Sequence, residues 1–246
     1  MYNEDVFDVV FLIGRPAAGK SEIIDFLIKT TESERKKRFH IGDFREIDDF
    51  PMLWTWFEED AILESMGKPR LHTSSDGYFL YEYLWHVLIR RLEVELIKLE
   101  HSGSVFGKDA TAVVEFSRGV GHGGYLKAFS HFSKDLLSRG AIVYIDVSFE
   151  ESLRKNRRRY DPDAPHSILG HSLPDEKLRK LYGEVDWEEL RNGQSEYVTI
   201  KDVRIPFVVF ENEDDVTTGN TELLPGRLED TLGRLWNRYS RRQEER

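Results

Sequence analysis

The sequence predicts an α/β fold in which a parallel β-sheet lies between two layers of helices, a three-layer αβα arrangement. Short apolar runs of strand length alternate along the chain with longer amphipathic stretches at helical spacing. A glycine-rich turn connects the first apolar run to the first amphipathic stretch. With 246 residues, 39% of them hydrophobic, the chain is expected to form a single domain over residues 1–246.

Five apolar runs predict a five-stranded parallel sheet. The first run is almost continuously apolar, as expected of a strand that is buried on both faces. The second is short and ends at Gly42 and Asp43. Residues 161–200 are mixed in character and predict short helices only. The predicted strands are Val6–Ile13, Phe39–Ile41, Thr111–Phe116, Ala141–Val147 and Ile205–Phe210.

Capping residues and apolar periodicity predict the helices. Pro51 suits the first position of a helix that continues to Met66. Asp76 is expected to cap a long helix with apolar residues at helical spacing up to residue 99. Ser148 begins a capping box and therefore a helix. Further helices are expected over 21–30, 124–138 and 228–241, whereas the charged stretch 32–38 is interpreted as a solvated connector.

The most informative motif follows the first strand and has the spacing G-x-x-x-x-G-K-S. Its glycines allow backbone N–H groups to point inward, and the helix that follows adds positive partial charge at its N-terminus. Lys20 is expected to reach the β- and γ-phosphates of a nucleotide, and the Ser21 hydroxyl to bind Mg²⁺. The sequence therefore predicts a nucleoside triphosphate site made of Gly14, Arg15, Pro16, Ala17, Ala18, Gly19, Lys20 and Ser21.

Composition and charge exclude several classes of protein. The formal net charge of −10 argues against binding of long nucleic acid through a broad basic face. The chain has no cysteine, which rules out disulfides, cysteine-bound zinc and thiol catalysis. No leader segment is expected before the first strand, and no apolar run approaches the length that spans a membrane. We therefore expect a cytoplasmic protein with no membrane partner.

Charged residues follow the second and third predicted strands. Ligands of open parallel sheets bind beyond the carboxyl ends of the strands. Glu115 is expected there to hold Mg²⁺ through water or to accept a proton, and Arg118 to bind a phosphate or carboxylate. The alternative is a surface ion pair between these two residues. Asp43 is expected at the same edge as a base for an acceptor hydroxyl, or else as a simple turn residue.

The segment 154–159 has five basic residues in six positions. On a helix Arg154, Arg157 and Arg158 would share a face, and phosphate oxygens would relieve their repulsion. The alternative is a solvated face whose arginines pair with neighbouring carboxylates. We expect a phosphate-binding role, with residues 154–175 becoming ordered when a nucleotide binds.

A few polar and aromatic residues are given no catalytic role. Asp48 and Asp49 are interpreted as ordinary loop residues. Trp56 and Trp85 are expected in the core. His122, in the glycine-rich loop 119–124, is expected to be exposed.

Over residues 6–50, 78–160 and 203–212, the chain resembles P-loop kinases of the nucleoside- and nucleotide-kinase type. Gly14–Ser21 carries most of the resemblance. The fourth strand followed by residues 154–159 is similar to the strand and arginine-bearing lid helix of these kinases. Residues 115–118, which read Glu-Phe-Ser-Arg, are similar to their acid-plus-arginine motif, with altered spacing. Residues 161–202 are longer than a minimal lid connection.

The resemblance implies a sheet order of 2-3-1-4-5 and a helical lid insertion at about 150–202. It implies ATP and Mg²⁺ as cofactors, with Ser21 and Glu115 on the metal. Asp43 would lie where such kinases place an acidic residue, and Asn212 near the adenine. The expected function is an ATP-dependent phosphotransferase for a small acceptor such as a nucleoside, nucleotide or hydroxylated metabolite.

Two other functions are compatible with the same residues. One is a regulatory nucleotide-binding protein with slow or no hydrolysis, whose insertion binds a partner. The other is a kinase acting on RNA ends, which the negative charge disfavours. The oligomeric state is open, and a homodimer is compatible with the sequence.

Overall fold

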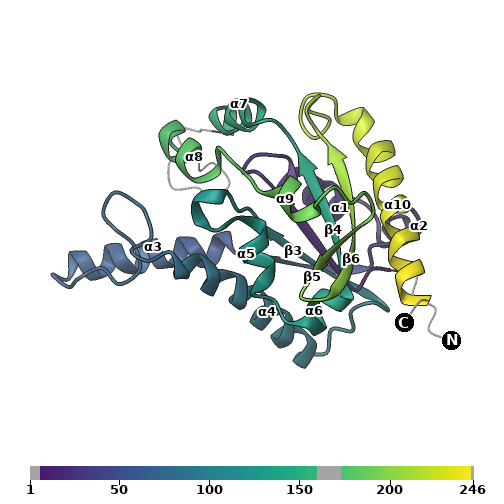
Figure 1. Cartoon of the computed structure of the whole chain (residues 1–246), viewed down its shortest axis with the longest axis horizontal. Helices are drawn as coiled ribbons and strands as arrows, with labels where there is room; N and C mark the ends of the chain where they lie inside the picture. Colours follow the sequence, from purple (N-terminus) through teal and green to yellow (C-terminus); the bar gives the residue numbers. More distant parts are fainter. Residues whose placement is uncertain (1–5, 160–172, 245–246) are drawn as a thin grey trace.

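The computed structural model describes residues 6–159 and 173–244, in which a six-stranded sheet lies between two layers of helices (Figure 1). The strands lie in the order β2-β3-β1-β4-β6-β5. All neighbouring pairs are parallel except β6 and β5, which are antiparallel. The α/β class predicted from the sequence is confirmed. The bounds are β1 Val9–Gly14, β2 Asp43–Asp48, β3 Ala110–Phe116, β4 Gly140–Asp146, β5 Tyr197–Ile200 and β6 Val203–Glu211.

The predicted count of five strands is wrong because β5 extends the sheet beyond β6, which is the predicted fifth strand. Ile200 pairs with Val203, so only Lys201 and Asp202 connect the two strands. Both connecting residues have positive φ, 51° and 66°, as the favoured two-residue hairpin turns require. Asn and Gly are the usual residues in such turns, and their absence here left the hairpin unpredicted.

The second strand lies further along the chain than predicted. Residues 39–41 end a helix and lead into β2, in which only Ile47 is buried. β2 is at the edge of the sheet and is rich in charged residues, which is a common protection of edge strands. An apolar pattern therefore could not locate it.

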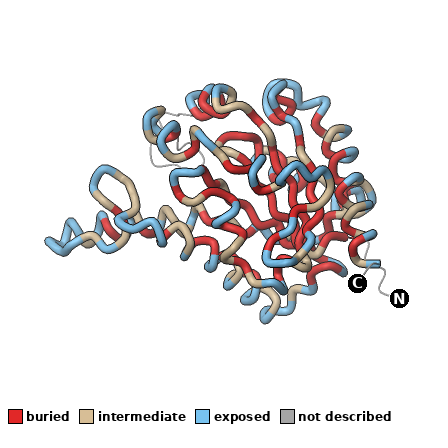
Figure 2. Tube along the Cα trace, viewed as in Figure 1, coloured by how far each residue is buried: buried red, intermediate tan, exposed pale blue. Residues whose placement is uncertain are grey.

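Two sets of helices cover the two faces of the sheet. On one face α1 (Lys20–Lys29), α2 (Glu32–Phe39) and α10 (Leu224–Glu244) pack against the strands. On the other face lie α4 (Tyr83–His101), α5 (Gly124–Ser130), α6 (Lys134–Arg139) and α9 (Trp187–Arg191). Figure 2 shows the buried residues concentrated in the sheet between these layers. Within the described ranges, no helix is both long and apolar enough to cross a lipid bilayer.

The charged stretch 32–38 is the helix α2 and not the predicted connector. Thr31 caps it by accepting a hydrogen bond from Glu34 N. The buried Arg35 side chain donates to the carbonyl oxygens of Leu27, Thr30 and Gly42. These buried hydrogen bonds give a mostly solvated helix a fixed place beside α1.

Helix α3 (Phe50–Ser65) and the segment 66–82 form an arm that projects from the body (Figure 1). Pro51 lies in the first turn of α3, as predicted. Asp76 does not cap α4, which begins at Tyr83; its carboxylate accepts a hydrogen bond from Ser74 instead. Trp56 is buried in the arm, as expected of a core residue, and stacks on His72.

The region of the predicted lid contains α7 (Phe149–Arg159) and α8 (Asp175–Tyr182). Ser148 Oγ accepts a hydrogen bond from Glu151 N, which confirms the predicted start of α7. Leu153 of α7 packs with Leu178 and Tyr182 of α8. Residues 160–172 of the predicted lid lie outside the described residues, so the expected ordering of 154–175 cannot be followed through that segment. The short helices η1 (Val120–His122) and η2 (Thr221–Leu223) complete the fold.

Candidate functional site

The glycine loop lies where the sequence predicts it, between the carboxyl end of β1 and the start of α1. A Cβ on Gly14 would lie 2.8 Å from the carbonyl oxygen of Ile145 on β4. Gly19 has a φ of +114°, and a Cβ there would lie 2.6 Å from Asn212 Nδ2. Ala17, between them, is buried with a φ of 57°, which is strained for a residue other than glycine. The backbone at both glycines therefore tolerates no side chain.

Neighbouring elements hold the loop in place from behind. Asn212 Nδ2 donates to Ala18 O at 2.7 Å, and Ser152 Oγ of α7 donates to Pro16 O at 2.7 Å. The Arg15 guanidinium donates to the carbonyl oxygens of Val147 and Gly183. Asn212 is fully buried under the loop. The Asn212 side chain therefore supports the loop through its hydrogen bond to Ala18 O, and its expected place near the adenine stays a prediction.

Lys20 and Ser21 open helix α1. The first backbone hydrogen bond of this helix runs from Ile23 N to Gly19 O, so the amides at its start face the loop. The buried Lys20 ammonium lies over the loop, donating to Arg15 O at 3.0 Å and to Ser117 Oγ at 2.8 Å. The Ser21 side chain is at the surface. A helix N-terminus with a lysine and an accessible hydroxyl fits a phosphate group with its bound Mg²⁺.

Two carboxylates meet beside this lysine. Glu115 Oε1 lies 3.8 Å from Lys20 Nζ, and Glu115 is paired across the sheet with Asp48, the last residue of β2. Burial raises the pKa of Asp48 to about 8, with repulsion from Glu115 and Asp49 adding to the shift. Sequence reasoning dismissed Asp48 as a loop residue because the strand that ends there was placed too early.

Asp43 does not lie at this edge. It begins β2 and pairs with Ala110, the first residue of β3, so it lies at the opposite end of the sheet from the glycine loop. Its carboxylate is exposed and lies 2.9 Å from the Arg45 guanidinium. The prediction that Asp43 serves as the base is therefore wrong, because the whole length of β2 separates it from the loop.

Arg118 lies at the predicted edge, but it is 2% exposed and already paired. Its Nη2 lies 2.6 Å from Asp49 Oδ2 and also donates to Trp85 O. The guanidinium stacks over the Trp85 ring, 5.1 Å from the centroid. The pair is thus buried and involves Asp49, not the surface pair with Glu115 that was the alternative. The Arg118 guanidinium is therefore part of the packing at this edge of the sheet and is not exposed to a ligand.

His122 is also buried, contrary to expectation. It is 1% exposed, and its ring stacks on Trp85 with centroids 4.2 Å apart. Its Nδ1 accepts a hydrogen bond from Gly119 N. Burial, with the Arg118 charge, lowers the pKa of His122 to about 3, so the ring is neutral at physiological pH. The glycine-rich loop 119–124 is therefore packed around this histidine.

The arginines of α7 separate into two groups. Arg154 and Arg158 both face Asp215 in the loop after β6, at 2.8 Å and 3.9 Å. Arg157 turns to Asp175 of α8 instead, so the predicted common face of three arginines is wrong. Lys155, which the sequence gave no reason to single out, is 5% exposed and lies 2.7 Å from Asp215 Oδ1. Carboxylates therefore hold all four side chains in this structure.

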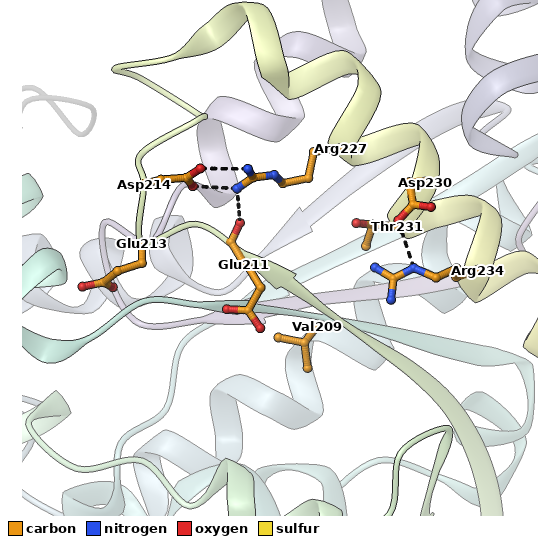
Figure 3. Close-up of a pocket in the computed structure, with 8 residues that line it drawn as sticks. All are labelled: Val209, Glu211, Glu213, Asp214, Arg227, Asp230, Thr231 and Arg234. Carbon is orange, nitrogen blue, oxygen red and sulfur yellow. Dashed lines mark hydrogen bonds and ion pairs between the residues drawn. The ribbon is translucent and has the colours of Figure 1, made fainter.

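A separate hollow of about 460 Å³ lies between the end of β6 and α10 (Figure 3). Two arginines on its wall are engaged with acidic neighbours: Arg227 with Asp214, and Arg234 with Asp230. None of its lining residues belongs to the glycine loop. Among the described residues, no group of three or more His, Asp or Glu side chains is gathered as a metal site.

Comparisons with known proteins do not identify a family. No family model matches the chain, and no curated protein matches it in sequence. Among solved structures, "Crystal structure of APE1195" is 15% identical with a TM-score of 0.39, over 93% of this chain and 98% of that one. "Crystal structure of TT1252 from Thermus thermophilus" is 13% identical with a TM-score of 0.38, over 90% and 98% of the two chains.

Proposed function

We propose that this protein is an ATP-dependent phosphotransferase that acts on a small-molecule acceptor and uses Mg²⁺. One observation carries the proposal: a loop suited to phosphate lies beside two carboxylates, Asp48 and Glu115, on neighbouring strands. A loop alone would suit a nucleotide-binding protein of any kind. A carboxylate with a raised pKa at the same edge adds a group that can exchange a proton with an acceptor.

In this proposal the chain's own residues position and stabilise the charged groups. The amides of the glycine loop and Lys20 bind the donor phosphates. Ser21 and Glu115 would hold Mg²⁺, and the metal would supply positive charge to the donor's phosphates. Hard oxygen ligands of this kind suit Mg²⁺, which retains several waters and depends partly on the substrate's phosphates.

Asp48 takes the role of base that the sequence suggested for Asp43. It must be ionised to accept the proton of an acceptor hydroxyl, and its pKa of about 8 leaves it mostly protonated at pH 7. A cation close to the pair would lower that pKa. In the free enzyme the value of kcat/KM is therefore expected to rise with pH towards 8.

The test begins with the donor. Lys20→Ala should weaken ATP binding by roughly ten- to a hundredfold, since one charged contact is worth about 1.5–3 kcal/mol. Lys29→Ala is the matched control, because Lys29 is on the same helix, is exposed and pairs only with Asp25 among its described contacts. Calorimetry with ATP and Mg²⁺ measures both variants. Equal ATP binding by the Lys20→Ala variant and the unchanged protein would refute the donor site.

Transfer itself is tested by a screen with labelled ATP. Nucleosides, nucleotides and small hydroxylated metabolites are offered as acceptors, and labelled products are separated and counted. Phosphorylation of an acceptor that is lost in Lys20→Ala supports the proposal. Lys20-dependent ATP binding with no phosphorylated product from any class would instead favour a regulatory nucleotide-binding protein.

A further inference from the structure

Asp215 occupies a tightly closed turn in the loop that follows β6. Its φ is 56°, in the left-handed region. Its carbonyl oxygen accepts hydrogen bonds from the backbone N–H groups of Thr218, Gly219 and Asn220. The turn therefore fixes the backbone at Asp215 and the direction of its Cα–Cβ bond.

Three cations of α7 converge on this one carboxylate. Arg154 lies 2.8 Å, Lys155 2.7 Å and Arg158 3.9 Å from its oxygens. Glu151 on the same helix contacts Arg154 and Lys155. Three positive charges against two negative charges leave the cluster with one excess positive charge. Burial acts to raise the pKa of Asp215, but its pairing with Lys155 and Arg154 outweighs burial and keeps the pKa below its usual range, so Asp215 is ionised.

The same cluster adjoins the glycine loop. Thr217, two residues after Asp215, has its Oγ1 2.7 Å from the position that a Cβ on Gly19 would take. The same oxygen accepts a hydrogen bond from Lys155 Nζ at 3.4 Å. One turn earlier on α7, Ser152 donates to Pro16 O. The cationic side of α7 therefore lies beside the loop that would hold the phosphates.

We propose that the Asp215 carboxylate is an internal anion that competes with the donor's phosphates for Arg154, Lys155 and Arg158. This inference rests on the proposed function and concerns regulation of the same site. Without donor, Asp215 keeps the three cations paired and α7 docked on the loop after β6. A triphosphate then binds by drawing these cations away from Asp215, so the carboxylate lowers donor affinity.

Asp215→Asn tests the proposal, because the amide keeps the shape of the side chain and removes its charge. Losing this charge should tighten ATP binding about three- to tenfold, since two unit charges about 4 Å apart change an affinity by roughly this factor when water screens them. The gain should be smaller for ADP and absent for adenosine, which carries no phosphate. Calorimetry at one fixed salt concentration gives the three affinities.

Asp214→Asn is the matched control. It removes the same charge from the same loop, but the Asp214 carboxylate forms its ion pair with Arg227 on α10 and not with Arg154 or Arg158 of α7 (Figure 3). ATP affinity should change less than twofold in this variant. An equal gain in both variants would mean that the overall charge of the loop matters, and that would overturn a specific role for Asp215.

Arg154→Gln provides a second variant, because the Arg154 side chain is half exposed and its removal leaves the turn at Asp215 intact. It should weaken ATP binding at least threefold and cancel most of the gain in the double variant with Asp215→Asn. Unchanged or weaker ATP binding in a folded Asp215→Asn protein overturns the competition. If the unchanged protein binds no ATP at all, the proposed function itself fails, and the two failures are thereby distinguished.

Discussion

Asp48 and Asp60 are aspartates in two regions of the molecule, and their surroundings have opposite effects on their acidity. Asp60 of the arm is fully buried and accepts hydrogen bonds from Leu71 N, His72 N, Thr73 N and Thr73 Oγ1. These donors outweigh burial and lower the pKa of Asp60 to about 2. Asp48 has one such donor, Phe50 N, and its pKa rises to about 8.

The difference separates a structural carboxylate from a candidate functional one. A buried charge that is fully hydrogen-bonded is stable and has no tendency to exchange a proton. The ionised form of Asp48 is disfavoured by burial and by the nearby charges of Glu115 and Asp49. Carboxylates with raised pKa values concentrate at functional sites. Loss of Asp48 at the edge of the sheet should therefore mainly reduce activity, whereas loss of Asp60 in the arm should mainly reduce stability.

The largest expected effect is on the rate of phosphate transfer when Asp48, at the edge of the sheet, is replaced. Asp48→Asn should lower kcat for phosphate transfer by about 10²–10⁴, the usual contribution of a general base. ATP binding should change far less, because Asp48 is not in the glycine loop. Steady-state kinetics with an acceptor from the screen measure both quantities. A variant that keeps full kcat would remove Asp48 from the mechanism.

A large effect of a different kind is expected in the arm. Asp60→Ala should reduce the free energy of unfolding by roughly 2–4 kcal/mol, because it leaves several buried donors without their acceptor. Glu59→Ala on the same helix is the control, since Glu59 is exposed. Urea unfolding followed by fluorescence compares the two. Equal stability of both variants would show that solvent replaces the acceptor without cost.

A smaller effect is expected on the pH dependence of stability, to which Asp48 contributes. The folded-state pKa of Asp48 lies above its unfolded value of about 4, so its contribution to stability is lost as pH rises through about 8. The unchanged protein should therefore lose more stability between pH 5 and pH 8 than Asp48→Asn does. Urea unfolding at both pH values measures this. Identical losses would contradict the raised pKa of Asp48.

The smallest effect is expected for Asp43→Asn. This residue is exposed, pairs with Arg45 and lies at the far end of β2 from the loop. Both kcat and KM should stay within about twofold of the unchanged protein, and stability within about 0.5 kcal/mol, as for most surface changes. A hundredfold fall in kcat would return the catalytic role to Asp43.

The parts that the sequence predicted well are those with strong local signals. The glycine loop has fixed spacing, and its glycines stand where only glycine fits: Gly19 has a left-handed φ and Gly14 closely approaches the Ile145 carbonyl, so both were identified directly. Continuous apolar runs located β1, β3, β4 and β6 because these strands are buried on both faces. The start of α7 was identified by its capping box.

The charged residues around the glycine loop were predicted poorly because their signals are not local. A charged edge strand has no apolar pattern, so its bounds were misplaced and Asp43 was chosen instead of Asp48. Helical spacing grouped Arg154 with Arg157, yet each arginine pairs with whichever carboxylate the neighbouring elements place nearby. Lys155 gave no signal because its burial depends on a loop that lies far along the chain.

By itself the sequence determined the α/β class, the position of the glycine loop and the residue types that surround it. These follow from periodicity and from conformational limits that act within a few residues. Only the tertiary structure decided which charges meet. A buried carboxylate's partners and pKa depend on donors and charges brought together from distant strands and helices, as the contrast between Asp48 and Asp60 shows.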